Sequence, residues 1–232
     1  RFSDQIPIER SFQFLNGQPQ IIPCHAPLGL LGNHDMAGLA QLSTEGAKVF
    51  AREVAQYCKA YNLDGVNYDD EYSLYPDLGN PSFATPSAQA GARLCYETKQ
   101  VMPDKLVTVF AYGNMYGVES VDGVDVDEWI DIVVPNYGSA AYPLGNMDKW
   151  KCAGLAAEFN LHGGGSLDSY GAQKILSGGY GWHMGFAANP NNYTTIFQRL
   201  SGAYELYGSK LKDPTIFYKK NEPTPSKYPE DL

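Results

Sequence analysis

Residues 64–71 read Asp-Gly-Val-Asn-Tyr-Asp-Asp-Glu, and this octet decides which fold the chain can adopt. Successive side chains of a β-strand point to opposite faces. In a strand over 63–72, one face would carry the polar side chains of Asn67, Asp69 and Glu71. The other face would carry Val66 and Tyr68. The octet therefore predicts a strand whose apolar face packs under helices while its polar face lines the mouth of a barrel.

The polar face of the octet has the composition of a catalytic motif. Asp69 and Glu71 would hold two carboxyl groups roughly 6–7 Å apart at the rise of a strand. Each group disfavours ionisation of the other, so one of them is expected to keep its proton near neutral pH. A protonated carboxylic acid beside an ionised carboxylate is suited to acid-catalysed bond cleavage.

Strand-like runs and helical patterns alternate along the rest of the chain. Apolar runs typical of strands occupy 28–31, 63–72, 106–112, 130–137, 155–160 and 180–187. Helical patterns occupy 44–61, 166–176 and 193–207. A fourth helical pattern opens with Thr85 as N-cap and Pro86 in the first turn. Such alternation indicates an α/β protein with a parallel sheet.

Polar or glycine-rich segments follow several of these strands, as they do in a (β/α)8 TIM-type barrel. Only six strands are evident, residues 1–25 are too few for two more βα units, and a barrel of this type needs about 250 residues. We therefore expect a barrel that is incomplete or lacks its N-terminal βα units in this chain. A single barrel domain is expected over 1–232, with an uncertain N-terminal segment at 1–25 and an irregular tail at 213–232.

Composition narrows the classes of partner. The formal charge of −9 argues against nucleic acid as a ligand. Aromatic residues make up 13% of the chain and include 17 Tyr, whose flat faces and hydroxyls suit sugar surfaces. No run of 18 apolar residues occurs, and Arg1 opens no signal peptide. We expect a monomer that is secreted, periplasmic or at the cell surface.

The four cysteines give no sign of a metal site. Cys24, Cys58, Cys95 and Cys152 form no CxxC pair. A domain of this size needs no disulfide to be stable, so free buried thiols are favoured over disulfides.

Resemblance to a known family adds to this interpretation. The octet resembles the DxxDxDxE motif of glycoside hydrolase family 18, and LDGVNYDDEYS at 63–73 resembles its endo-β-N-acetylglucosaminidase branch, of the Endo H and Endo F type. Three further segments are similar to the same branch: LGNHDMAG at 31–38, ARLCYETKQVMPDKLVTV at 92–109 and GYGWHMGFAANPN at 179–191. The resemblance covers roughly residues 27 to 210.

This resemblance implies a (β/α)8 barrel that cuts the β-1,4 bond inside the GlcNAc–GlcNAc core of N-linked glycans, without a cofactor or metal. Configuration is retained because the acetamido oxygen of the substrate attacks the anomeric carbon. By the same resemblance, Glu71 is the general acid and then the base, and Asp69 orients the acetamido N–H. Tyr137 matches the tyrosine that hydrogen-bonds the acetamido oxygen.

Further residues at or near strand ends are candidates for contacts with the sugar. They are Asn33, His34, Tyr112, Asn114, Asn136, Glu158 and Phe186. A structural ion pair is an equal alternative for Glu158, and a place in the core is an alternative for Phe186. His34 has the alternative of a loop hydrogen bond.

Asn67 departs from the family motif, which has an acidic residue at this position. Asparagine can still hydrogen-bond Asp69, but it brings no charge, so Asp69 should ionise more easily. Asn67 is a candidate substrate contact, with a spacer below the site as the alternative.

Three alternatives to this function stay open. One is a non-catalytic glycan-binding barrel, and another is a chitinase-type hydrolase. The third is a hydrolase that holds Mg²⁺ on Asp69, Asp70 and Glu71, although adjacent residues of a strand point opposite ways and would chelate poorly together.

Overall fold

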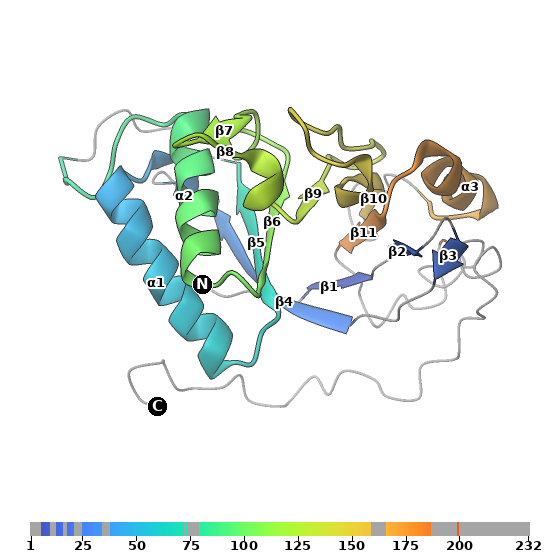
Figure 1. Cartoon of the computed structure of the whole chain (residues 1–232), viewed down its shortest axis with the longest axis horizontal. Coiled ribbons are helices and arrows are strands. Elements are labelled where there is room, and N and C mark those ends of the chain that lie inside the picture. Colours follow the sequence, from blue (N-terminus) through green and yellow to red (C-terminus); the bar gives the residue numbers. More distant parts are fainter. Residues whose placement is uncertain are drawn as a thin grey trace.

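The computed structural model describes residues 6–9, 13–15, 18–20, 25–33, 38–71, 73, 79–158, 166–186 and 199 (Figure 1). It is an α/β protein built on parallel strands. The strands are β1 (Ile6–Glu9), β2 (Gln13–Leu15), β3 (Gln18–Gln20), β4 (His25–Asn33), β5 (Gly65–Asp70), β6 (Leu106–Phe110), β7 (Ser120–Val121), β8 (Val124–Asp125), β9 (Ile132–Val134), β10 (Ala153–Glu158) and β11 (Trp182–Phe186). The helices are α1 (Thr44–Ala60), α2 (Ala88–Val101) and α3 (Ser169–Gly178), with short 3-10 helices at Leu39–Gln41, Val126–Glu128 and Lys149–Lys151.

The main sheet has the strand order β1-β4-β5-β6-β9. Strands β4, β5, β6 and β9 run parallel, and β1 pairs antiparallel with β4. The six strands predicted from the sequence are β4, β5, β6, β9, β10 and β11, so the parallel arrangement is confirmed. Because the strands are parallel, their carboxyl ends meet at one edge.

The remaining parallel pair, β10 and β11, continues the order of the main sheet. A parallel bridge from Val133 to Cys152 joins β9 to the residue before β10. At the far side, β11 lies beside β1 (Figure 1). Among the described strands, neighbours in space therefore follow the order β4, β5, β6, β9, β10, β11 and β1.

Helices α1 and α2 pack together and cover β5 and β6 (Figure 1). The predicted helix at 44–61 is confirmed, and the Ser43 hydroxyl caps its first turn by accepting from the Gly46 N–H at 3.1 Å. The predicted helix at 166–176 is confirmed as α3, which ends at Gly179 with φ 73°.

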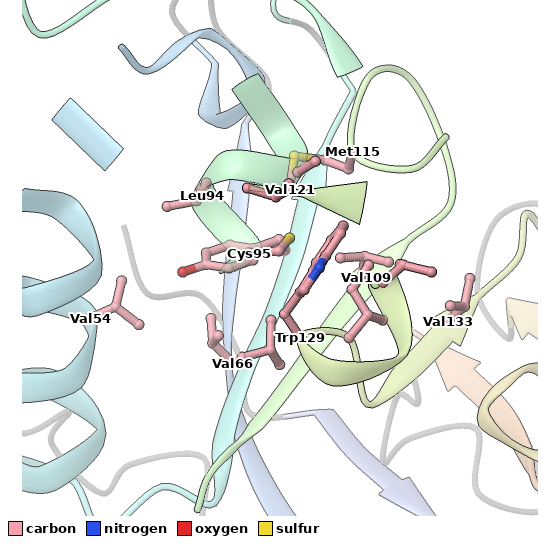
Figure 2. Close-up of a cluster of buried hydrophobic side chains, with 14 of the residues drawn as sticks. Val54, Val66, Leu94, Cys95, Val109, Met115, Val121, Trp129 and Val133 are labelled. Carbon is pink, nitrogen blue, oxygen red and sulfur yellow. The ribbon is translucent and has the colours of Figure 1, made fainter. Parts of the chain in front are cut away.

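Apolar side chains gather on both faces of the strands. On the helix side, Val66 of β5 and Val109 of β6 meet Val54 of α1, Leu94 of α2 and the buried indole of Trp129 (Figure 2). On the inner side lies a second cluster from β6, β9, β10 and β11: Phe110, Ile132, Val134, Ala153, Ala156, Trp182 and Met184. Strand β5 contributes no residue to the inner cluster.

The alternation expected of the octet is confirmed in β5. Val66 and Tyr68 are buried on the helix side, whereas Asn67 and Asp69 are only half-buried. The Tyr68 hydroxyl lies 2.7 Å from Thr98 Oγ1 on α2. Because Thr98 Oγ1 donates to the Leu94 carbonyl at 2.7 Å, the proton between the two hydroxyls comes from Tyr68. Burial raises the pKa of Tyr68 well above its usual value.

Two predictions about local structure were wrong or incomplete. The N-cap of α2 is Ser87, not Thr85, because the Ser87 hydroxyl accepts from the Ala90 N–H at 3.2 Å and Pro86 precedes the cap. The β7–β8 hairpin was not predicted, although Asp122 and Gly123 turn it with φ of 51° and 79°.

The ends of the chain were only partly assessed from the sequence. Within 1–25 the structure has the short strands β1, β2 and β3, which had not been predicted. Arg199 is the one described residue of the predicted helix at 193–207, and the predicted tail at 213–232 lies outside the described residues.

The thiols of Cys58, Cys95 and Cys152 are free and buried, as predicted, and Cys24 lies outside the described residues. Within the described part of the chain, no helix combines the length and apolar composition that crossing a bilayer requires.

Replacing Tyr68 by Phe should lower the free energy of unfolding by about 1 kcal/mol, because a buried hydrogen bond is lost while the ring stays. Chemical denaturation measures this change. Tyr170→Phe, at a tyrosine that is 78% exposed on α3, is the control and should leave stability unchanged. Equal stability of Tyr68→Phe and the original chain would contradict the hydrogen bond to Thr98.

Candidate active site

The candidate site lies at the carboxyl end of β5. Asp69 pairs in register with Gly32 of β4, and Asp70 pairs with Asn33, the last residue of β4. On the other edge, the pairing with β6 ends at Tyr68 and Val109. Glu71 is half-buried and follows directly after the strand, beyond the last pair on both sides. Asp69 and Glu71 are therefore presented where the parallel strands end.

Asn67 lies one step below Asp69 on the same face. The Thr108 hydroxyl, on the neighbouring strand β6, donates to Asn67 Oδ1 at 2.7 Å. The same hydroxyl also lies 3.1 Å from the Val66 carbonyl oxygen, and the Asn67 amide has N–H groups that can donate. This arrangement supplies hydrogen bonds without adding a negative charge.

Tyr137 reaches the site from the turn after β9. Its backbone N–H donates to Asn136 Oδ1 at 2.7 Å, and Ser139 N–H donates to the Asn136 carbonyl at 3.1 Å. Gly138 N–H donates to the carbonyl of Ala156 in β10 at 2.8 Å. The Asn136 side chain thus shapes the turn that carries Tyr137, and Gly138 adopts the left-handed φ of 74° that the turn requires.

Three carboxylates act on the Tyr137 hydroxyl. The pKa of Tyr137 is raised to about 12, first by burial and then by the negative charges of Asp69, Glu158 and Glu71. Asp69 and Glu158 lie at the carboxyl ends of β5 and β10, and Glu71 and Tyr137 follow β5 and β9 at the same edge. At neutral pH the Tyr137 hydroxyl keeps its proton and can donate a hydrogen bond.

An aromatic row runs from the rim of the site inward. Tyr112, 44% exposed, stacks on Phe110 with ring centroids 5.7 Å apart, and Phe110 lies 6.3 Å from Tyr137. Tyr137 stacks on Phe186 at 6.1 Å with the planes 26° apart. Rings at the end of an apolar cluster offer flat faces of the kind that sugar rings bind.

Glu158 ends β10 beside Phe186, its register partner in β11. Its side chain is buried, and its backbone carbonyl accepts from Arg199 Nη1 at 3.0 Å. Arg199 also donates to the Ser166 hydroxyl at 3.3 Å, so the arginine links the end of β10 to the segment before α3.

Asp70 points away from Asp69, to the helix side of the sheet. Its carboxylate is buried and accepts from the Ala40 N–H at 2.7 Å and from the Ser73 hydroxyl. Asp69 and Asp70 therefore do not share a ligand. Among the residues that the structure describes, no three His, Cys, Asp or Glu side chains gather as metal ligands would.

The other predicted contacts divide into two groups. Tyr112, Glu158 and Phe186 lie in or beside the cluster around Tyr137. Asn114 is half-buried, on the loop that follows β6. The backbone of Asn33 ends β4 next to Asp70, and His34 lies outside the described residues.

Three further residues shape the site and were not identified from the sequence. They are Thr108, Phe110 and Gly113. Counting in steps of two from Leu106 places Thr108 and Phe110 on the inner face of β6, which would have identified them. Gly113 has φ 55°, and a Cβ there would lie 2.8 Å from the Asp70 carbonyl oxygen, a close approach between loops that no local pattern predicts.

Known proteins are similar to this chain over most of its length. Endo-beta-N-acetylglucosaminidase F1 from Elizabethkingia meningoseptica is 41% identical over 202 residues, 84% of this chain and 59% of that protein. The Endo-beta-N-acetylglucosaminidase from Flavobacterium sp. (strain SK1022) is 31% identical over 160 residues, 68% of this chain and 50% of that protein. No protein-family model matches the chain.

Solved structures agree with the sequence relatives. The chain is 68% identical to Bacteroides thetaiotamicron EndoBT-3987 with its Man5GlcNAc product, with a TM-score of 0.79 over 89% of this chain and 49% of that one. Over most of its length, the chain is thus similar to proteins of the endo-β-N-acetylglucosaminidase type. A second EndoBT-3987 structure, in complex with Man9GlcNAc2Asn substrate, matches at 67% identity and a TM-score of 0.79, and covers 53% of that chain.

The family resemblance predicted from the octet is thus confirmed. The chain spans 59% of the length of the Elizabethkingia meningoseptica protein and about half the length of the other relatives.

The raised pKa of Tyr137 predicts a pH dependence of stability. The folded chain holds this proton more tightly than the unfolded chain, in which the pKa is about 10. The resulting stabilisation is complete below about pH 10 and is lost as the pH rises through about 12. Tyr137→Phe removes this contribution, so its free energy of unfolding should fall less over that window than that of the original chain.

Urea unfolding at a series of alkaline pH values measures the difference. Tyr170→Phe, at an exposed tyrosine, is the matched control and should follow the original chain. Parallel pH curves for Tyr137→Phe and the original chain would show that the three carboxylates do not act on this hydroxyl.

Proposed function

We propose that this chain carries the catalytic barrel of an endo-β-N-acetylglucosaminidase, which hydrolyses the β-1,4 GlcNAc–GlcNAc bond in the core of N-linked glycans. The observation that carries the proposal is that Asp69 and Glu71 at the end of β5 and Tyr137 just after β9 share the carboxyl edge of one parallel sheet. Relatives at 41% and 31% identity that are named endo-beta-N-acetylglucosaminidases support it.

The fold proposed for the whole domain is a (β/α)8 barrel. Support comes from the order of the parallel strands, from the bridge between Val133 and Cys152, and from the contact of β11 with β1. An inner apolar cluster below the site and an outer cluster under the helices are also what a barrel wall requires.

Glu71 is proposed as the general acid of the first step. It gives its proton to the glycosidic oxygen while the bond from that oxygen to the anomeric carbon breaks. The acetamido oxygen of the same sugar forms the new bond to that carbon, which produces an oxazolinium-like ion. In the second step the Glu71 carboxylate takes a proton from water, and the water oxygen attacks the anomeric carbon. The bond from that carbon to the acetamido oxygen breaks, which opens the oxazolinium ring and restores the acetamido group with configuration retained.

Asp69 and Tyr137 are proposed to hold the acetamido group for this attack. The Asp69 carboxylate accepts the acetamido N–H and stabilises the positive charge that develops on the ring. The Tyr137 hydroxyl, neutral because its pKa is about 12, donates to the acetamido oxygen. Holding the reacting atoms in line supplies a large part of the rate enhancement.

N-linked glycans of the high-mannose class are the substrates proposed for test. The named complexes of EndoBT-3987 hold Man9GlcNAc2Asn and Man5GlcNAc, and this chain shares 67% and 68% identity with them. Tyr112 and Phe186 would provide flat faces for the sugars.

Replacing Glu71 by Gln should abolish turnover of Man9GlcNAc2Asn and leave the fold and glycan binding intact. Glutamine keeps the shape of the side chain but cannot give up a proton, and general acid–base catalysis contributes about 10²–10⁴-fold. Mass spectrometry of released glycan measures turnover, and calorimetry measures binding of the intact glycan.

Chitin oligomers incubated with the original chain separate the related activities. Release from Man9GlcNAc2Asn and none from chitin oligomers supports the proposal, whereas the reverse indicates a chitinase. Binding without release by the original chain would indicate a lectin-like protein. Full activity of Glu71→Gln would remove Glu71 from its proposed role.

Tyr137→Phe should lower kcat by about 10–100-fold, because one hydrogen-bond donor to the reacting group is lost. The shape of the kcat profile between about pH 5 and 9 should stay as in the original chain, since Tyr137 does not titrate in that range. Initial rates across this range test the expectation. A shifted profile would contradict a neutral donor.

A further inference from the structure

Glu71 lies beyond the last backbone pair of β5, so something other than strand pairing must hold it in place. The pairing of β5 with β6 stops at Tyr68, and the pairing with β4 stops at Asp70. Glu71 follows both. A general acid needs its carboxyl group held to within a fraction of an ångström of the oxygen that it protonates.

Asp70, the residue before Glu71, is anchored on the helix side of the sheet. Its side chain is 2% exposed, and one of its oxygens, Oδ2, accepts both from the Ala40 N–H at 2.7 Å and from the Ser73 hydroxyl. The Ser73 hydroxyl thus ties a point two residues after Glu71 to the residue directly before it. Buried hydrogen bonds to a carboxylate are among the stronger ones in proteins.

Gly38 and Gly113 both lie in close contact with Asp70. A Cβ on Gly38 would overlap the Ser73 side chain and lie 2.7 Å from Asp70 Oδ1. On the opposite side, a Cβ on Gly113 would lie 2.8 Å from the Asp70 carbonyl oxygen and 3.9 Å from Glu71 Cα. The backbone at residues 70 and 71 is therefore enclosed between the loop that follows β4 and the loop that follows β6.

The partner of Asp70 is itself anchored. The carbonyl of Ala40 accepts from Ser87 N–H at 3.0 Å, and the carbonyl of Gln41 accepts from Ala84 N–H at 2.7 Å. Ser43 N–H donates to the Ser82 carbonyl at 2.9 Å. The segment 38–43 is thereby tied to the cap of α2, so a carboxylate bound to it is bound to the rigid helical layer.

We propose that Asp70 is a positioning residue for the general acid Glu71. Gly38, Ala40, Asp70 and Ser73 form what we call the Asp70 clasp, which fixes the backbone of Glu71 to the helical layer and so aims its carboxyl group at the glycosidic oxygen. The clasp acts through Glu71 and does not touch substrate. This inference rests on the proposed function of Glu71.

Three variants separate the clasp from a general effect on stability. Asp70→Ala loses the accepting oxygen and should lower kcat for Man9GlcNAc2Asn by at least about tenfold, with KM changed by less than about twofold. Ser73→Ala loses one donor to Asp70 and keeps the donor at Ala40, so it should give a smaller loss of kcat. Asp70→Asn keeps an oxygen in the same place and should retain kcat within about threefold of the original chain.

Tyr68→Phe is the matched control, because Tyr68 lies two residues earlier on the same face of β5 and also loses a buried hydrogen bond. It should lower stability and leave kcat unchanged when all variants are assayed well below their melting temperatures. A purely structural role would make kcat follow stability, so a loss of kcat in Tyr68→Phe equal to that in Asp70→Ala would overturn the proposal. Equal losses in Asp70→Asn and Asp70→Ala would also overturn it.

Crystal structures of the same variants test the clasp without using activity. Asp70→Ala should displace the Glu71 carboxyl group by about 1 Å or more relative to the original chain, and Asp70→Asn should not. An unmoved Glu71 in Asp70→Ala would refute the clasp even if turnover fell. Failure of the original chain to release glycan would instead refute the proposed function, while the displacement would still decide the role of Asp70.

Discussion

The register of β5 between β4 and β6 is the constraint on which the site depends. A slip by one residue would turn Asp69 toward the helices and Tyr68 toward the inner face. That slip is prevented because Val66 and the ring of Tyr68 are buried against the helical layer. Burial of the apolar half of the octet therefore determines where the acidic half points. The same residues that stabilise the sheet also orient the proposed chemistry.

Electrostatics then gives each side chain of the site a separate task. Burial and the negative charges of Asp69, Glu158 and Glu71 raise the pKa of Tyr137 to about 12, so the tyrosine stays protonated at neutral pH. A donor that stays neutral can face the acetamido oxygen, while a carboxylate can face the positive charge of the transition state. Aromatic rings in contact with Tyr137 exclude water from one side of it, which strengthens these interactions.

Much of this arrangement could be predicted from the sequence, because period-two and helical patterns are local. The six parallel strands, the helices α1 and α3, and the two faces of the octet were predicted correctly. The N-cap of α2 was placed two residues early, since Thr85-Pro86 and Ser87 are both acceptable caps and only tertiary contacts choose between them. The contacts of Asp70 with Ala40 and of Gly113 with Asp70 join loops far apart in the chain, so no local pattern could reveal them.

Asn67 shows how the site accommodates its departure from the family motif. An aspartate at this position would place a further carboxylate below Asp69, in a site that already holds Asp69, Glu71 and Glu158 around Tyr137. Like charges repel one another, so a neutral amide adds less repulsion to this site than an aspartate would. The Thr108 hydroxyl binds the amide oxygen and leaves the amide N–H groups to donate. A hydrogen-bond donor at this position thus adds polar contacts to the site without adding a negative charge.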